Sequence, residues 1–301
     1  ICGVKLGLGT AQFGLDYGLT NAAGRVPERD VAAILWEAAR GGICYVDTAP
    51  AYGRAETVLG RLLPTASPLR IITKTRHHPD AVNPRADLQA DLDATLLALR
   101  RSTVHGLIVH QAADLLSPGG ERLWSALEDI KSAGLTAKIG VSVYTPEQAD
   151  ALAARFPLDL IQLPFSLCDQ RMLTGGQLAR LKARNVEIHA RSLLLQGIVL
   201  TDPRRLPAFL SPLAPRLRAL ADAARNCGCS VGELALAFPR LVGRIDAGIL
   251  GVTSLAELKA LMAAMARPVP ALTFDDFAVN DPRLIDPRTW PPATPRLKKR
   301  A

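Results

Sequence analysis

Short apolar segments alternate with amphipathic segments along the whole chain. The short segments are rich in Val, Ile and Leu, and several are almost continuously apolar. Strands that are buried on both faces of a parallel sheet have this pattern. The predicted strands are Lys5–Leu8, Ile43–Asp47, Arg70–Thr73, Val104–His110, Ala137–Ser142, Leu158–Leu163, Val186–Arg191 and Ile245–Leu250.

The segments between these strands have apolar residues at helical spacing. The first begins at Pro27 and stops at Gly41-Gly42, which is a typical entry and exit for a helix. The predicted helices are Pro27–Arg40, Glu56–Leu63, Ala86–Arg101, Glu121–Ala133, Pro146–Ala154, Thr174–Ala183, Pro215–Asn226 and Leu255–Ala266. Trp36 and Trp124 fall inside two of them, and we expect both to be packing residues.

Eight strand–helix units with short connections predict a single (β/α)8 barrel, the TIM barrel. The alternative is a doubly wound open sheet, which normally has a glycine-rich dinucleotide turn after its first strand. Residues 7–12 lack the third glycine of that motif and do not open a helix, so we reject this alternative. The barrel is expected to span residues 1–267. Residues 268–301 are expected to form a proline-rich C-terminal extension without long regular structure and with a basic end.

The net charge of +8 raises the question of an anionic partner such as nucleic acid, lipid or phosphate. Four basic side chains lie in the last six residues, namely Arg296, Lys298, Lys299 and Arg300, and without them the charge is 8 − 4 = +4. Aromatic residues make up only 5% of the chain, which is unfavourable for a surface that stacks bases. We therefore expect no nucleic-acid or membrane partner.

The chain has five cysteines, an odd number without a disulfide framework: Cys2, Cys44, Cys168, Cys227 and Cys229. Free thiols in a reducing compartment are the expected state, and no apolar run reaches the ~18 residues that cross a bilayer. These features predict a cytoplasmic protein. The Cys227-Gly-Cys229 pair lacks the further ligands of a zinc site, so no metal is expected.

Four ionisable residues fall at the ends of consecutive predicted strands or in the loops that follow. They are Asp47, Tyr52, Lys74 and His110. The C-terminal strand ends of such a barrel meet at one mouth, where active sites lie. An ammonium favours the phenolate form of a nearby tyrosine, and a carboxylate beside the lysine fixes the ammonium. An imidazole orients a substrate oxygen, so the set suits protonation of an alkoxide formed by hydride delivery.

These residues stand in segments that resemble the aldo-keto reductase family. The segments are Val46-Asp47-Thr48-Ala49, Tyr52-Gly53, Glu56, Leu59-Gly60, Ile72-Thr73-Lys74-Thr75, Leu107-Ile108-Val109-His110, Lys138–Ser142 and Asp159–Gln162. The resemblance runs from about residue 4 to residue 266. It implies an oxidoreductase that reduces an aldehyde or ketone to an alcohol, or the reverse, with a nicotinamide cofactor held without a Rossmann domain. By resemblance Tyr52 is the general acid, Lys74 lowers its pKa, Asp47 pairs with Lys74 and His110 orients the carbonyl.

The same resemblance implies NADP(H) as cofactor, with NAD(H) not excluded. The implied cofactor-binding residues are Gly9, Thr10, Asp47, Ser142, Gln162, Arg191, Ser192, Leu193, Gly197, Gly251, Thr253 and Glu257. The implied substrate contacts are Phe13, Tyr52 and His110. The diphosphate of the dinucleotide is the expected anionic partner, and the loop 201–212 is expected to fold over the cofactor.

The chain departs from the family pattern at three places. Val143 replaces the usual asparagine after the fifth strand, and Arg191 replaces an aromatic residue after the seventh. A guanidinium there could lie against a ring, bind a substrate carboxylate or the diphosphate, or form a salt bridge at the rim. The motif of the last helix appears only as Glu257–Leu261, and no basic residue stands where one would grip a 2′-phosphate.

Two other functions remain open at this point. One is a regulatory module that binds a nicotinamide cofactor without turnover. The other is a lyase or isomerase in which Lys74 forms a Schiff base. The expected partner of an enzyme is a small carbonyl or alcohol substrate, and the sequence leaves the oligomeric state open.

Overall fold

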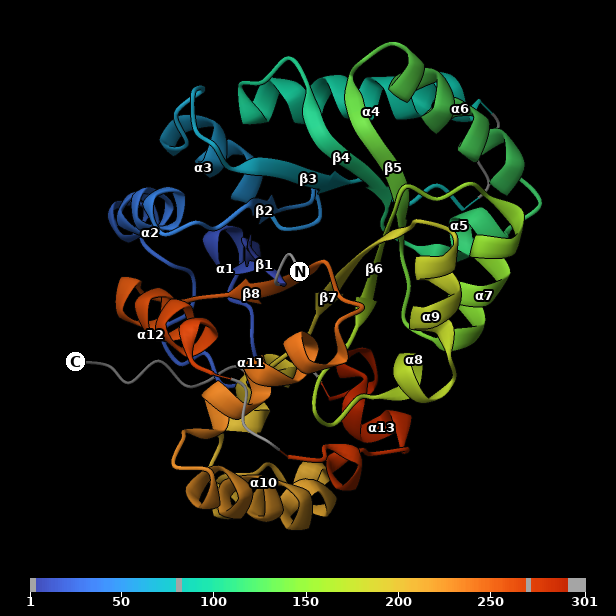
Figure 1. Cartoon of the computed structure of the whole chain (residues 1–301). Coiled ribbons are helices and arrows are strands. Elements are labelled where there is room, and N and C mark those ends of the chain that lie inside the picture. The colour runs from blue at the N-terminus through green and yellow to red at the C-terminus, as the bar shows by residue number, and fades with distance from the viewer. Residues whose placement is uncertain (1–3, 80–82, 269–271, 292–301) are drawn as a thin grey trace.

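Eight parallel strands close into a barrel in the order β1 to β8 (Figure 1). The structure is a computed structural model that describes residues 4–79, 83–268 and 272–291. Each strand pairs with the next along the chain, and β1 pairs with β8, which confirms the predicted (β/α)8 fold. The strands are β1 Lys5–Gly9, β2 Tyr45–Asp47, β3 Arg70–Lys74, β4 Val104–Val109, β5 Thr136–Ser142, β6 Leu160–Pro164, β7 Glu187–Arg191 and β8 Ala247–Gly251.

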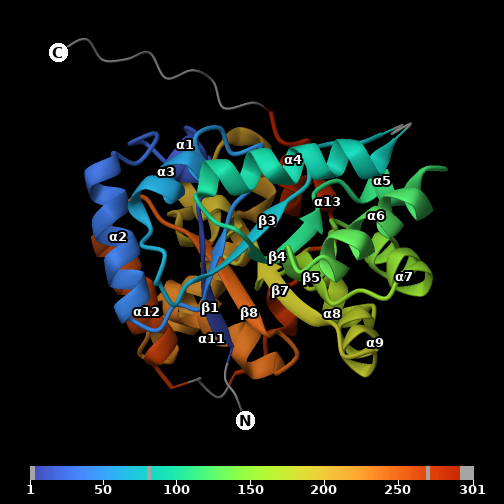
Figure 2. The same ribbon diagram turned by 90° about the horizontal axis from the view of Figure 1, so that it is seen from above.

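A ring of helices covers the outside of the barrel (Figures 1 and 2). The main ones are α2 Glu28–Arg40, α3 Ala55–Leu62, α4 Pro84–Leu99, α6 Gly120–Ser132, α7 Pro146–Arg155, α9 Gln177–Ala183, α10 Ala214–Asn226 and α12 Leu255–Ala266. Short helices are α1 Ala11–Gly14, α5 Ala112–Leu116, α8 Arg171–Thr174 and α13 Pro282–Ile285. Of the helices in the described ranges, none is both long and apolar enough to cross a membrane.

One further helix, α11 Val231–Val242, follows α10 and was not predicted. Its sequence is mostly apolar, with Glu233 and Arg240 as its charged residues, and Pro239 lies inside it. The available signal was the capping box at its start, in which Ser230 and Glu233 bond each other's backbone N–H. The predicted helix Thr174–Ala183 is also corrected, because Gly175 and Gly176 separate α8 from α9.

The described part of the C-terminal segment, residues 272–291, packs on the barrel through short helical turns. The side chains of Phe274, Phe277 and Ile285 are buried in the hydrophobic core. The Val279 N–H donates to the Cys168 carbonyl at 2.8 Å, which ties this segment to the loop after β6. The predicted basic end, Arg296 to Arg300, lies outside the described residues.

The two tryptophans predicted to pack have different surroundings. Trp124 is buried and stacks on Phe156 with 5.0 Å between ring centroids. Trp36 is 59% exposed, and the prediction for it was wrong. It faces outward from α2, where the Arg40 guanidinium covers its ring at 4.3 Å.

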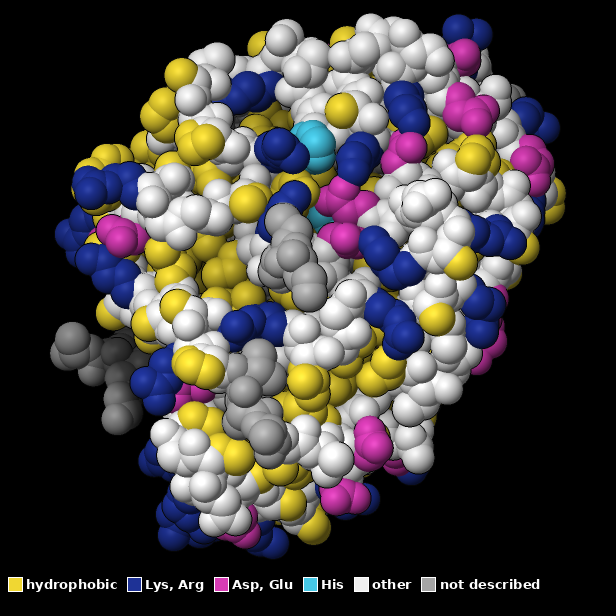
Figure 3. Space-filling view, in the orientation of Figure 1, with side chains coloured by type: hydrophobic (Ala, Val, Ile, Leu, Met, Phe, Trp, Pro, Cys, Tyr) yellow, Lys and Arg dark blue, Asp and Glu magenta, His cyan; other side chains and the backbone are white. Residues whose placement is uncertain are grey.

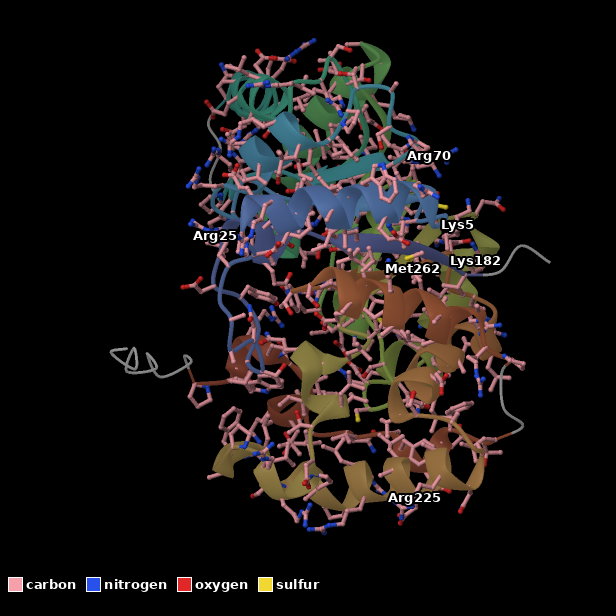
Figure 4. The ribbon with its side chains drawn as sticks, turned by 90° about the vertical axis from the view of Figure 1, so that its left-hand side faces the viewer. Lys5, Arg25, Arg70, Lys182, Arg225 and Met262 are labelled. Atoms are coloured by element: carbon pink, nitrogen blue, oxygen red, sulfur yellow. The ribbon has the colours of Figure 1, made fainter. Side chains whose placement is uncertain are left out.

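A polar network fills the end of the barrel at which the strands begin. Glu187 at the start of β7 accepts hydrogen bonds from Tyr45 at 2.9 Å and from the buried His189 at 2.7 Å, and it pairs with Lys138. Figure 3 shows a histidine beside basic and acidic side chains in the upper part of this face. Lys5 and Arg70 lie at the same end, whereas Arg25 lies at the opposite end (Figure 4).

An apolar layer lies inside the barrel above this network. It consists of Ile72, Ile108, Leu160 and Ala247, packed against the ring of Tyr45. Each of the four is less than 1% exposed. The layer separates the polar network at the strand starts from the strand ends.

We predict that the Glu187 network stabilises the fold in a pH-dependent way. Burial alone would raise the pKa of Glu187, but hydrogen bonds from His189 and Lys138 outweigh it and hold the pKa well below its usual range. Such a carboxylate contributes stability at neutral pH that is lost as the pH falls below its ordinary pKa of ~4.3. Glu187→Gln should therefore cost about 2 to 4 kcal/mol of unfolding free energy at pH 7.

Urea unfolding at pH 7 and at pH 3 measures this effect. Glu121→Gln is the matched control, because Glu121 pairs with Arg155 on the surface with its side chain 67% exposed, and it should change stability by about 0.5 kcal/mol or less. Equal costs for the two variants at pH 7 would contradict the prediction.

Candidate active site

A pocket of about 460 Å³ opens at the C-terminal ends of the strands. It runs from the barrel centre, where Tyr52 and His110 line it, to the start of the outer helix α12. All of the expected cofactor-binding residues line it: Gly9, Thr10, Asp47, Ser142, Gln162, Arg191, Ser192, Leu193, Gly197, Gly251, Thr253 and Glu257. The structure thus brings residues from seven of the eight strands and their loops to one cavity.

Two expected site residues do not line the pocket. Lys74 is 2% exposed and lies beneath the floor. Phe13, expected to contact substrate, is 1% exposed and belongs to the hydrophobic core. Phe13 lies on α1, whose one turn directs this ring inward, and Tyr17 from the following loop lines the pocket instead.

A buried ion pair joins the ends of the neighbouring strands β2 and β3. Lys74 Nζ donates to both carboxylate oxygens of Asp47 at 2.8 Å and to the Thr48 carbonyl at 2.9 Å. Asp47 Oδ1 also accepts from Gln162 Nε2 at 2.7 Å. Burial lowers the pKa of Lys74, and the charge and hydrogen bonds of Asp47 oppose that shift. All three ammonium protons therefore have acceptors.

The backbone around Tyr52 is fixed by close contact with α1. A side chain on Gly14 would place its Cβ 1.8 Å from the Tyr52 carbonyl oxygen, so only glycine allows this approach. Gly53 has a φ of +60° and lies against Gly14 in turn. The contact of these two glycines holds the Tyr52 ring over the ion pair, with Lys74 Nζ 5.0 Å from the ring centroid.

The Tyr52 phenol is a weaker acid than an exposed tyrosine. Burial raises its pKa, and the Asp47 carboxylate raises it further. The resemblance implied that Lys74 lowers this pKa, but the Lys74 charge is compensated by Asp47 at 2.8 Å. In this state of the site Tyr52 therefore holds its proton at neutral pH.

His110 follows β4 and lies edge-on to Tyr52, with 5.9 Å between ring centroids. Burial lowers its pKa to about 4, and the nearby charge of Lys74 acts in the same direction. The imidazole is therefore neutral at neutral pH and able to donate a hydrogen bond from one ring nitrogen. Its backbone N–H bonds the Thr75 hydroxyl at 3.4 Å.

Arg191 at the end of β7 takes part in a stack of cations and an aromatic ring. Its guanidinium lies 3.9 Å from the ring centroid of Tyr144, and its Nη2 donates to the Val143 carbonyl at 2.9 Å. Arg288, held by Asp286, lies 3.5 Å from the same centroid. Among the described residues no carboxylate lies within salt-bridge distance of Arg191. A cation without a close counter-ion is thus left in the pocket.

Several polar lining residues were not predicted from the sequence, among them Gln12, Tyr144 and Gln196. Gln196 accepts from the Leu19 N–H at 3.0 Å and so joins the loop after β7 to the loop after β1. Both loops follow strand ends, which was the available signal. The contact between these two loops depends on how distant strands pair, so no local sequence pattern predicts it.

The chain has the architecture of a TIM-barrel enzyme. Its polar pocket lies at the C-terminal ends of the strands, and a buried lysine–carboxylate pair lies beneath the pocket. The model of the aldo/keto reductase family matches residues 5–278, and the chain belongs to this family of oxidoreductases. Members of the family act on small molecules and generally use nicotinamide cofactors.

Comparison with individual proteins agrees with this assignment. L-galactose dehydrogenase from Arabidopsis thaliana is 25% identical over 297 residues, covering 91% of this chain and 90% of that protein. The holo structure of an aldo-keto reductase from Bacillus halodurans has a TM-score of 0.70 at 20% identity, covering 91% of this chain and 89% of that one. Glycerol dehydrogenase from Gluconobacter oxydans has a TM-score of 0.70 at 22% identity, covering 90% and 88%. The two structures show the shared fold.

We predict that removing Lys74 leaves a costly buried charge. Lys74→Met should lower the unfolding free energy by about 3 to 5 kcal/mol, because the Asp47 carboxylate loses its counter-ion. The double variant Lys74→Met/Asp47→Asn should recover part of that loss. Chemical denaturation of the two single variants and the double variant closes the cycle, and additive losses would contradict the ion pair.

We also predict that His110 stays neutral across the physiological range. An unshifted histidine titrates near ~6.5, whereas His110 should titrate at about 4. NMR of the imidazole carbons between pH 3.5 and 8, assigned with His110→Gln, measures the midpoint. A midpoint at or above ~6 would contradict the desolvated environment.

Proposed function

We propose that the protein interconverts a carbonyl compound and its alcohol by hydride transfer with NAD(P)H, with Tyr52 as general acid. The observation that carries the proposal is the position of Tyr52 and His110 in one pocket, directly above the Lys74–Asp47 pair. The family assignment supports the same reaction class.

The residues present fit a nicotinamide cofactor. Gln162 donates through Nε2 to Asp47, so its Oε1 is left to accept from a primary amide, and the Ser142 hydroxyl lines the pocket beside it. These two groups would hold the carboxamide, and the loops after β7 and β8 would hold the rest of the cofactor. When bound, the nicotinamide supplies or accepts the hydride.

The chain's own residues handle the substrate oxygen and its proton. Neutral His110 donates a hydrogen bond to the carbonyl oxygen and orients it, and its low pKa keeps it from acting as the acid. Tyr52 gives its phenolic proton to that oxygen as negative charge develops. The ammonium of Lys74 faces the phenolate that remains, and Asp47 holds the ammonium in place.

A small hydroxylated carbonyl compound is the substrate class that we propose. The pocket near Tyr52 has the hydroxyls of Tyr17 and Tyr144 and the guanidinium of Arg191, which suit polar substrate groups. By their names, two similar proteins act on L-galactose and on glycerol, which are compounds of this kind.

The geometry favours this function over the two alternatives. A Schiff-base enzyme needs a lysine amine free to attack a carbonyl, but Lys74 is buried, ion-paired and absent from the pocket lining. A module that only binds cofactor has no need for Tyr52 and His110 at the mouth with shifted pKa values.

We predict that Tyr52→Phe lowers kcat by about 10²- to 10⁴-fold, the range for a lost general acid, while the Kd for the cofactor changes less than about threefold. Steady-state kinetics on an aldehyde panel and fluorescence titration with NADH and NADPH measure both quantities. Tyr17→Phe is the matched control, because it removes a phenol from the same pocket and should change kcat by less than about tenfold. Turnover by Tyr52→Phe at the wild-type rate would refute the assignment.

A further inference from the structure

The pocket extends from Tyr52 at the barrel centre to the start of the outer helix α12, which we call its far end. Glu257 and Thr253 line the cavity there. Glu257 Oε2 accepts from the Thr253 N–H at 2.7 Å and from the Thr253 hydroxyl at 2.9 Å. The Glu257 N–H donates to the Ser254 hydroxyl at 3.1 Å. The carboxylate is therefore held in one place, with its Oε1 not used in these bonds.

The charges along the pocket differ between its two ends. Arg191 lies at the Tyr52 end, where its charge lowers the pKa of His110. Of the described residues that line the pocket, Arg191 is the sole lysine or arginine. The Asp47 carboxylate is compensated by Lys74, so Glu257 leaves the far end negative.

Neighbouring basic residues do not change this balance. Lys259 on α12 pairs with Glu37 on α2 at 3.7 Å, on the outer surface. Arg25 lies at the pocket end of the molecule (Figure 4), but it is not among the lining residues. The far end of the cavity thus presents a fixed carboxylate without a lining cation.

We propose that Glu257 makes this enzyme select NAD(H) over NADP(H). The inference rests on the proposed function, which places a nicotinamide dinucleotide in this pocket with its reactive ring at the Tyr52 end. The other half of the dinucleotide then occupies the end that Glu257 lines. The two cofactors differ there by a single group, a ribose 2′-hydroxyl or a 2′-phosphate.

A fixed carboxylate treats these two groups in opposite ways. It accepts a hydrogen bond from a ribose hydroxyl, which is how acidic residues recognise NAD in other dinucleotide sites. A 2′-phosphate carries between −1 and −2 charges, has only acceptor oxygens when fully ionised, and is repelled. NADP sites place a cation near this group, and the lining here offers none at this end.

Two of the N–H groups at the start of α12 are already used within the protein. A helix N-terminus binds anions through its free N–H groups. Here the Thr253 N–H is taken by the Glu257 carboxylate and the Glu257 N–H by Ser254. These two N–H groups are therefore not available to a phosphate.

The experiment measures Kd for NADH and NADPH by fluorescence titration of the full chain at low salt. The wild type should bind NADH at least ~10-fold more tightly than NADPH. Glu257→Gln keeps the shape and the helix cap but removes the charge, so the NADH/NADPH gap should shrink at least ~5-fold, mainly through tighter NADPH binding. Thermal melts of each variant verify folding.

Glu233→Gln is the matched control. Glu233 caps α11 as Glu257 caps α12, with its Oε2 on the Ser230 N–H at 2.7 Å, but it does not line the pocket. This variant also removes a carboxylate charge and keeps an acceptor for the backbone N–H, and it should leave the cofactor preference unchanged. A shift in preference of the same size in both variants would overturn the role of Glu257.

A second readout needs no variant. If repulsion by Glu257 excludes the 2′-phosphate, raising the salt from ~20 to ~500 mM should narrow the NADH/NADPH gap of the wild type, because salt screens the repulsion. The fragments 5′-AMP and 2′,5′-ADP should show the same order as competitors of NADH.

The outcomes separate the inference from the function beneath it. NADPH binding as tight as or tighter than NADH, or a gap that survives Glu257→Gln, overturns the selection by Glu257 and leaves the carbonyl–alcohol reaction standing. Failure of both cofactors to bind at ~1 mM overturns the proposed function, and the selection with it.

Discussion

The buried pair of Lys74 and Asp47 is the interaction on which the rest of the site depends. An ammonium and a carboxylate that are removed from water are stable only when each compensates the other. The parallel register places the ends of β2 and β3 side by side, so the two residues meet there. Because Thr48 and Gln162 complete their hydrogen bonds, the pair fixes the floor on which the Tyr52 loop rests.

The neutrality of that pair determines the electrostatics of the whole pocket. With the floor compensated, the field along the cavity comes from Arg191 at one end and Glu257 at the other. The phenol of Tyr52 then stays protonated and the imidazole of His110 stays neutral, because burial dominates both. A pocket with a positive and a negative end orients a polar ligand before any close contact forms.

The sequence allowed the barrel and the four central residues to be predicted, because both follow from short-range patterns. Continuous apolar runs mark strands buried on both faces, and all eight observed strands overlap predicted ones. Asp47, Lys74 and His110 were found as residues at strand ends, where this fold gathers its chemistry.

What could not be predicted depends on contacts between distant segments. Helix α11 packs against α10 and α12, and Pro239 inside it is a local signal against a helix. The ring of Tyr144 lies against the guanidinium groups of Arg191 and Arg288, which are far from it and from each other in the sequence. The direction of the Tyr52 pKa shift depends on how deeply the ring is buried, which no single segment specifies.

An apolar layer separates the polar network at the strand starts from the pocket at the strand ends. It consists of Ile72, Ile108, Leu160 and Ala247. In the described part of the chain, no side-chain hydrogen bond crosses it from the Glu187 network to Asp47 or Lys74. Substitutions at the strand starts can therefore change the thermal stability, while substitutions at the strand ends change the substrate or the reaction. A scaffold divided in this way is a good starting point for directed evolution, since gains in robustness and changes in specificity can be selected independently.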